Sequence, residues 1–257
     1  MMGTSGTGNN EIYFTDVKFE EGEIATPWIP NPADAAYTAL GFDDGIEYDV
    51  SGYGNNGTVN GTLVVSSDSP KYNASTQIDG SIITCASGLV SVADPVFSVS
   101  LWFRLKSNTS YTSYQDLINF ASPSYSNQPF RLEICGSPVG NDIVWFRGPT
   151  GSTGGFKVNN TALSRDVWYH TVLVSEGNKQ YSYYMNGVKQ GTYNGSANTW
   201  TPTGSVTIGD SIAGKIDISD FRIYATALSA DAVKELYQTS ASLADNGTLM
   251  AYEFNEV

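Results

Sequence analysis

The sequence predicts an all-β protein, an antiparallel two-sheet sandwich with one short helix near its C-terminal end. Three observations predict this fold. The 257 residues include 16 tyrosines, 11 phenylalanines, 5 tryptophans and 26 glycines, a composition that favours strands and turns. Short alternating runs are separated by Asn-Gly or Asp-Gly pairs along most of the chain. One such pair joins two strongly alternating segments between residues 166 and 190.

The first 34 residues are predicted to precede the main domain. Residues 1–10 are small and polar, as in a flexible lead or a cloning junction. Residues 11–34 read as an alternating strand followed by a proline-rich linker. They either end a preceding domain or add a strand to the edge of the sandwich. The start of the chain lacks the basic and apolar regions of a signal peptide. No segment reaches the roughly 18 apolar residues that are needed to span a bilayer.

The main domain is predicted to occupy residues 35–257, and two of its segments alternate clearly. In residues 97–105, the side chains at odd positions share one face, which we expect to be buried: Phe97, Val99, Leu101, Phe103 and Leu105. In the second segment, Trp168 and His170 begin a strand with the same two-residue period. Asn186-Gly187 then supplies the two positive φ angles that a type I′ hairpin turn requires.

The predicted helix covers residues 229–237. Ser229 can cap the first amides, and Asp231 complements the positive end of the helix dipole. Val233, Leu236 and Tyr237 form an apolar stripe at helical spacing. A last strand is expected within residues 246–254.

Four segments resemble the laminin G-like (concanavalin A-like) jelly-roll domains, in the order in which that family has them. They are the opening at residues 41–57, the F-S-x-S-x-W strand at 97–105, the hairpin at 168–188 and the R-I-Y-x-x-A-L-S ending at 214–229. The resemblance implies a jelly-roll sandwich. It implies much less about function, because this fold carries lectins, adhesion modules and hydrolases.

A second resemblance concerns residues 17–34, with the sequence V-K-x-E-E-G-x-x-A-T-P-W-x-P-N-P-A-D. It is similar to the end of a carbohydrate-binding-module-like jelly roll in tail and minor structural proteins of phages and prophages of Gram-positive bacteria. The resemblance implies a virion tail or an extracellular surface, with cell-surface carbohydrate and other tail or surface-protein domains as partners, and it allows a homo-oligomer. An adhesion or structural module without sugar affinity is the alternative.

The charge of the chain limits its partners. Its 26 acidic and 13 basic residues give a net charge of −13, which repels nucleic acid and anionic membranes. Cys85 and Cys135 are too few for a disulfide framework, and we expect buried thiols, with a single disulfide between them as the alternative.

No catalytic residues are predicted. A hydrolase of the laminarinase type on this fold needs paired carboxylates on one strand, and no E-x-D-x-E motif is present. Along its own strand Glu133 has Arg131 and Cys135 as same-face neighbours, which predicts a surface ion pair rather than catalysis. His170 is the single histidine and is expected to pack within a strand. A glycoside hydrolase is therefore the weakest of the three functional hypotheses.

Calcium is the predicted cofactor, because the Gly- and Asn-rich opening loop offers hard oxygen ligands. In related laminin G-like domains, acids near the opening and closing motifs converge with this loop on one ion. Carried over by position, the resemblance implies Asp43 or Asp44, Asn55 or Asn56, and Asp217 or Asp220. The alternative is that the asparagines make a turn and the acids solvate it.

Sugars need aromatic platforms together with polar groups, and loops are expected to present them. The candidate ligand-binding residues are therefore the aromatic residues in predicted loops: Tyr111, Tyr114, Tyr125, Tyr193 and Trp200.

Overall fold

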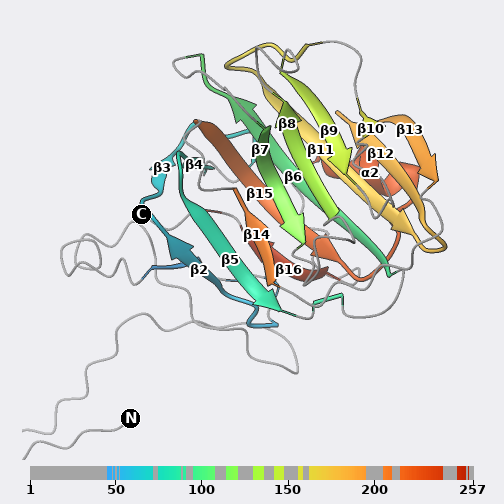
Figure 1. Cartoon of the computed structure of the whole chain (residues 1–257), viewed down its shortest axis with the longest axis horizontal. Coiled ribbons are helices and arrows are strands. Elements are labelled where there is room, and N and C mark those ends of the chain that lie inside the picture. Colours follow the sequence, from blue (N-terminus) through green and yellow to red (C-terminus); the bar gives the residue numbers. More distant parts are fainter. Residues whose placement is uncertain are drawn as a thin grey trace, which may run out of the picture.

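The computed structural model contains two antiparallel sheets, which stack face to face as a jelly-roll sandwich (Figure 1). It describes residues 45–47, 49, 51, 53–71, 75–87, 89–90, 95–107, 114–120, 130–135, 142–147, 156–158, 162–194, 205–209, 215–239, 248–252 and 254. The predicted lead, strand and linker of residues 1–34 lie outside this set. The fold class predicted from the sequence is confirmed.

Sheet A contains eight strands. In spatial order they are β1 (Ile46–Glu47), β2 (Gly57–Asn60), β5 (Ile82–Ser87), β14 (Ser205–Ile208), β7 (Tyr114–Phe120), β8 (Phe130–Cys135), β9 (Ile143–Arg147) and β10 (Phe156–Lys157).

Sheet B also contains eight strands. Seven of them follow the order β13 (Val188–Asn194), β12 (Gln180–Met185), β11 (Trp168–Glu176), β6 (Val96–Leu105), β15 (Ile216–Tyr224), β4 (Ser75–Ile78) and β3 (Val64–Ser66). The eighth, β16 (Thr248–Tyr252), pairs with β15 beyond the end of β4. The predicted last strand is thus confirmed.

The core lies between the two sheets and contains an interlocked group of aromatic rings. Phe97 of β6 and Tyr181 of β12 come from sheet B, while Phe120, Phe130 and Phe146 come from sheet A. Neighbouring ring centroids in this group lie 5.0 to 5.8 Å apart, mostly tilted or edge to face, the arrangement that ring quadrupoles favour. The alternating face predicted for residues 97–105 is buried here.

The predicted hairpin turn is present between β12 and β13. Met185 pairs with Val188, so the loop consists of the two residues Asn186 and Gly187, with φ angles of 50° and 75°. The Asn186 side chain also accepts a hydrogen bond from the His170 amide at 2.9 Å, which ties the turn to β11. His170 itself is buried in its strand, as predicted, and burial lowers its pKa to about 3.

Helix α2 (Ala230–Gln238) packs on the outer face of sheet B (Figure 1). Ser229 is its N-cap and accepts a hydrogen bond from the Ala232 amide at 3.2 Å. Val233 and Leu236 pack against residues of β11, β12 and β15, and the Tyr237 ring stacks on Trp102 at 5.6 Å. The predicted helix is therefore confirmed, although Tyr237 remains partly exposed.

Cys85 is a free thiol in β5, so the alternative disulfide to Cys135 does not form. Burial raises the pKa of this thiol to about 12, which keeps it protonated and unreactive at neutral pH. In the part of the chain that the structure describes, no helix has the length and apolar character needed to cross a membrane.

Candidate functional site

Polar side chains gather on the outer face of sheet A, across strands β7 to β10. Alternation explains their position, because Phe130, Leu132 and Ile134 of β8 point into the core and the residues between them point away from it. The strand register then aligns the outward residues of neighbouring strands. We call this group the sheet A face: Asp116, Asn119, Arg131, Glu133, Trp145 and Lys157.

Two rows cross the sheet A face. In one row Asn119 pairs with Arg131, and in the next Asp116 pairs with Glu133, which in turn pairs with Trp145. The Asp116 carboxylate accepts a hydrogen bond from Asn119 Nδ2 at 3.2 Å and lies 3.8 Å from Arg131 Nη1. An aromatic ring, two buried carboxylates, an amide and a guanidinium thus share the outer face of sheet A.

Lys157 completes this surface beside the tryptophan. It pairs with Trp145 in the register, and its Nζ lies 5.6 Å from the centre of the indole ring. An exposed cation–π contact of this kind contributes only about 0.5–1 kcal/mol. The lysine can therefore swing away from the ring at small cost.

Three polar atoms on the sheet A face have no hydrogen-bond partner among the residues that the structure describes. They are Asn119 Oδ1, Arg131 Nε and Trp145 Nε1, all buried from solvent although their residues are only half-buried. A buried polar atom without a partner costs about 1–3 kcal/mol. One acceptor and two donors on adjacent strands are thus unpartnered, and a ligand rich in hydroxyl groups reaches them once the side chains that cover them move.

Glu133 corrects one expectation from the sequence. The predicted surface position is wrong, because Glu133 is only 1% exposed. Asp116, on the neighbouring strand, is the acidic residue opposite it. A search along one strand misses this pair, since the sheet brings the two carboxylates together across strands.

The predicted ligand-binding aromatics occupy different places. Tyr114 begins β7, is half-buried, and pairs with Cys135 in the row next to Asp116 and Glu133. Tyr193 packs at the rim of the core, where its ring meets Phe146 at 5.9 Å and Tyr181 at 6.4 Å. Three of the five lie outside the described residues: Tyr111, Tyr125 and Trp200.

The predicted calcium ligands of the opening loop are held by Asp49. This carboxylate accepts hydrogen bonds from the amides of Asn55, Ser51 and Ala251 at 2.9 to 3.0 Å and from the Ser51 hydroxyl at 2.8 Å. The Asn56 side-chain oxygen accepts a hydrogen bond from the Asp49 amide at 2.9 Å. Asn55 and Asn56 therefore belong to a loop that is fastened to β16.

Gly57 closes this loop at a point of close approach. A Cβ atom at this position would lie 2.6 Å from Ile83 and 2.9 Å from the Tyr252 hydroxyl, which donates to the Asn55 carbonyl at 2.8 Å. No larger residue fits without displacing these neighbours.

The two predicted ligands from β15 have arginine partners. Asp217 accepts from Arg104 Nε at 2.8 Å, and Asp220 accepts from Arg222 Nε at 2.6 Å. Burial raises the pKa of Asp220, and Arg222 opposes this shift. Asp43 and Asp44 lie outside the described residues. Among the residues that are described, no three His, Cys, Asp or Glu side chains form a group able to hold a metal.

The Asp217 and Asp220 carboxylates are thus each paired with an arginine. The calcium site stays a prediction, since its two opening acids are not described.

Sequence reasoning missed Trp145 and Asp49. Alternation in residues 143–147 offered a signal for Trp145, because Val144 and Phe146 take the core positions and leave Trp145 on the other face. For Asp49 the local signals were Ser51, Asn55 and Asn56 in the same loop, whereas its partner Ala251 lies 202 residues away along the chain.

The family model of the concanavalin A-like lectin/glucanases superfamily, in its laminin G form, matches residues 79–234. This is more than half of the chain, which therefore belongs to that superfamily. The resemblance inferred from the motifs is confirmed at this level. No curated protein sequence matches the chain.

Solved structures resemble the fold at low sequence identity. The binding domain of Paraclostridial Mosquitocidal Protein 1 superposes with a TM-score of 0.60 and 16% identity, covering 76% of this chain and 52% of that one. The binding domain of botulinum neurotoxin serotype D gives 0.57 and 14%, covering 74% and 48%. This chain therefore spans about half the length of these two toxin domains.

A third structure matches over nearly its whole length. It is domain 4 of AbnA, an extracellular arabinanase from Geobacillus stearothermophilus, solved in complex with arabinotriose. Its TM-score is 0.54 at 22% identity, covering 76% of this chain and 98% of that domain. At such identities the likeness establishes the fold alone.

Proposed function

We propose that this chain is a non-catalytic carbohydrate-binding module that recognises a cell-surface glycan through the sheet A face. The observation that carries the proposal is the set of three unpartnered polar atoms beside Trp145. The AbnA domain solved with arabinotriose and the toxin binding domains support it, because they use the same fold for binding.

The chemistry of the face suits a saccharide. A sugar hydroxyl both donates and accepts, so one ring can satisfy the acceptor at Asn119 and the donors at Arg131 and Trp145. The indole ring can pack against the apolar side of the sugar once Lys157 has moved aside. Each satisfied atom recovers a penalty that the unliganded protein already pays, which is how a preformed site gains affinity.

A glycan array that includes bacterial cell-wall polysaccharides tests the proposal. We expect binding that Trp145→Ala abolishes and Asn119→Ala weakens about tenfold or more. Tyr53→Ala is the matched control, because Tyr53 is an aromatic residue that is 68% exposed and far from this face in the sheet order. Silence across the array would favour the alternative, a structural or adhesion module without sugar affinity.

The same array separates the sheet A face from the loop aromatics predicted from the sequence. Variants Tyr111→Ala, Tyr125→Ala and Trp200→Ala are measured alongside Trp145→Ala. If Trp200→Ala removes binding and Trp145→Ala does not, the module binds sugar through its loops and the sheet A face is the wrong site.

We further propose that the module belongs to a tail structural protein of a phage or prophage and acts at the virion tail or the cell surface. The resemblance of residues 17–34 to such proteins supports this assignment. Fluorescently labelled protein should stain Gram-positive cells of a host strain, and the Trp145→Ala variant should not. Absence of staining on every strain that displays the recognised glycan would contradict this assignment.

Glycoside hydrolysis is the second candidate function, and the cross-strand pair Asp116 and Glu133 is the observation that favours it. Hydrolysis requires one carboxyl group as acid and another as nucleophile or base. Asp116 already accepts a hydrogen bond from Asn119 and lies near Arg131. These contacts favour a role in ligand binding over a role in catalysis. Release of reducing sugar from laminarin by the wild type, lost in Glu133→Gln, would establish the hydrolase and overturn the non-catalytic assignment.

Calcium binding remains a separate proposal. It predicts that calcium raises the melting temperature of the wild type and that Asp43→Asn removes this increase, because a ligand that binds the folded state stabilises it. Equal melting temperatures with calcium and with a chelator would refute it.

A further inference from the structure

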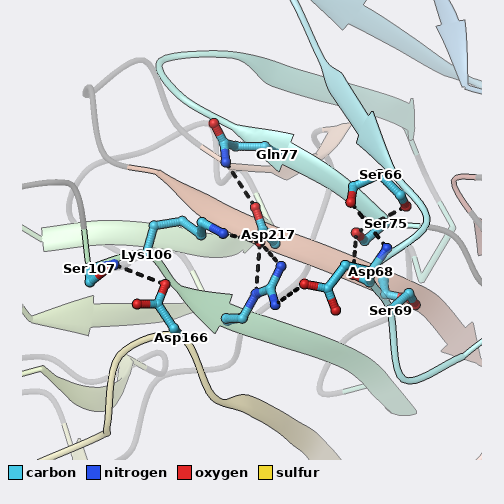
Figure 2. Close-up of polar contacts among 11 residues, drawn as sticks. Ser66, Asp68, Ser69, Ser75, Gln77, Lys106, Ser107, Asp166 and Asp217 are labelled. Atoms are coloured by element: carbon cyan, nitrogen blue, oxygen red, sulfur yellow. Dashed lines mark hydrogen bonds and ion pairs between the residues drawn. The ribbon is translucent and has the colours of Figure 1, made fainter.

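A network of charged side chains lies on the outer face of sheet B (Figure 2). Arg104 of β6 donates to Asp217 of β15 from Nε at 2.8 Å and from Nη2 at 2.5 Å. Gln77 of β4 donates to the other Asp217 oxygen at 3.1 Å, and Lys106 Nζ lies 3.5 Å from the carboxylate. Three neighbouring strands thus hold one buried ion pair in place.

Two groups of this network reach the surface. The Asp68 side chain is 66% exposed, and its carboxylate accepts Arg104 Nη1 at 2.5 Å. Its main chain is fixed by hydrogen bonds with Ser66 Oγ at 3.1 Å and Ser75 Oγ at 3.0 Å. Trp168, half-buried on β11, lies over the same guanidinium at 4.6 Å. Arg104 therefore orients a carboxylate and an indole ring side by side.

Stability alone does not account for this arrangement. A buried ion pair is often no more stabilising than apolar residues of the same size, because desolvation offsets the attraction. The outer pair between Arg104 and Asp68 is largely solvated and contributes little. What the network does provide is a fixed orientation for Asp68 and Trp168.

We propose that Asp68 and Trp168 form a second saccharide-binding site, with Arg104 and Asp217 as positioning residues. The indole face turned away from Arg104 packs against the apolar side of a sugar, and the Asp68 carboxylate accepts hydrogen bonds from two of its hydroxyls. Asp68 stays ionised for this purpose because the hydrogen bond from Arg104 lowers its pKa.

The charges disfavour an anionic ligand. Arg104 and Lys106 face three carboxylates, Asp68, Asp166 and Asp217, which leaves one negative charge in excess (Figure 2). A neutral sugar does not meet this repulsion.

The new site lies on the opposite side of the sandwich from the sheet A face, since Trp168 lies on sheet B and Asp68 follows β3 of the same sheet. It is independent of that face and would make the module bivalent, which raises avidity for a repeating polysaccharide.

Nuclear magnetic resonance with the nitrogen-15-labelled chain tests the proposal, because the indole signals of Trp145 and Trp168 report the two faces separately. The probes are the neutral trisaccharides arabinotriose and cellotriose. We expect both trisaccharides to shift the Trp168 signal in the wild type. Asp68→Asn should raise the Kd measured from the Trp168 signal at least tenfold and should leave the Trp145 isotherm unchanged. Val167→Ala, a change at an exposed neighbour of Trp168, is the control and should change neither.

Arg104→Lys tests the positioning role, since lysine keeps the charge but lacks the planar fork that holds both carboxylates. It should raise the Kd at Trp168 alone, whereas general loosening of the fold would weaken both sites. A Trp168 signal that neither trisaccharide moves overturns the second site, as does a Trp168 isotherm that Asp68→Asn leaves unchanged. Tighter binding of the anionic trisaccharide trigalacturonate there overturns the selection against anionic ligands.

A shifted Trp168 signal with an unmoved Trp145 signal would instead count against the sheet A face and leave this site standing. The two proposals therefore fail separately.

Discussion

The polar side chains on the two outer faces of the sandwich are held in different ways. Both faces carry polar side chains that alternate with core residues. On sheet B, helix α2 covers part of the face, and hydrogen-bonded ion pairs join Arg104 to Asp217 and Arg222 to Asp220. On the sheet A face no helix of the described chain lies over the strands, and the ion pair between Arg131 and Asp116 is long, at 3.8 Å. Among the described residues, three buried polar atoms lack partners there, and three also do so on the outer face of sheet B: Trp102 Nε1, Trp168 Nε1 and His170 Nδ1. The two faces therefore differ in the helix cover and the buried ion pairs of sheet B, and not in the number of their unpartnered polar atoms.

The largest effect is expected from breaking the Arg104 network. Arg104→Met leaves the buried Asp217 carboxylate without its main partner, and removing one member of a buried pair costs about 3–5 kcal/mol of unfolding free energy. Arg131→Met on the sheet A face should cost less than about 1 kcal/mol, because Arg131 is partly exposed and its ion pair is long. Urea unfolding measures both, and equal losses would break the comparison.

A second effect concerns pH and His170, which lies beneath helix α2 among Trp102, Tyr237, Lys71 and Ser100. Its pKa falls from 6.5 to about 3, mainly through burial. Between these pH values the unfolded chain holds a proton that the folded chain does not. Acidification through this window therefore destabilises the protein, by up to about 1.4 kcal/mol per pH unit.

Thermal unfolding of wild type and His170→Gln between pH 7.5 and 4 measures this contribution as a difference. That difference removes the opposing influence of Asp220, whose pKa is raised by burial. Parallel pH profiles for the two proteins would show that His170 contributes nothing.

A smaller effect is expected at the helix cap. Ser229→Ala removes the hydrogen bond to the Ala232 amide and should cost about 1 kcal/mol. Ser229→Asp restores an acceptor and should recover most of the loss. If both variants have the same melting temperature, the Ser229 cap does not stabilise helix α2 on sheet B.

The smallest effect on stability should come from Asn119→Ala on the sheet A face, within about 0.5 kcal/mol of wild type in urea unfolding. Its Oδ1 has no partner to lose, although its Nδ2 does donate to Asp116. A destabilisation above about 2 kcal/mol would show that this face is structural and would remove the contrast between the two sheets.

The elements that alternation and turn chemistry specify could be predicted from the sequence. The buried face of residues 97–105, the Asn186-Gly187 turn and the Ser229 cap depend on residues within one strand, turn or helix, so their positions follow from local periodicity. The place of His170 inside its strand follows for the same reason.

The candidate sites depend on which strands become neighbours, and the sequence does not specify this. Asp116 and Glu133 face each other because β7 pairs with β8, and Arg104 meets Asp217 because β6 pairs with β15, more than a hundred residues away along the chain. Asp49 likewise binds the amide of Ala251. The sequence by itself determined the fold class and its local turns and caps, because these follow short-range rules. Only the tertiary structure decided which polar groups meet, since cross-strand contacts arise from pairing between distant segments.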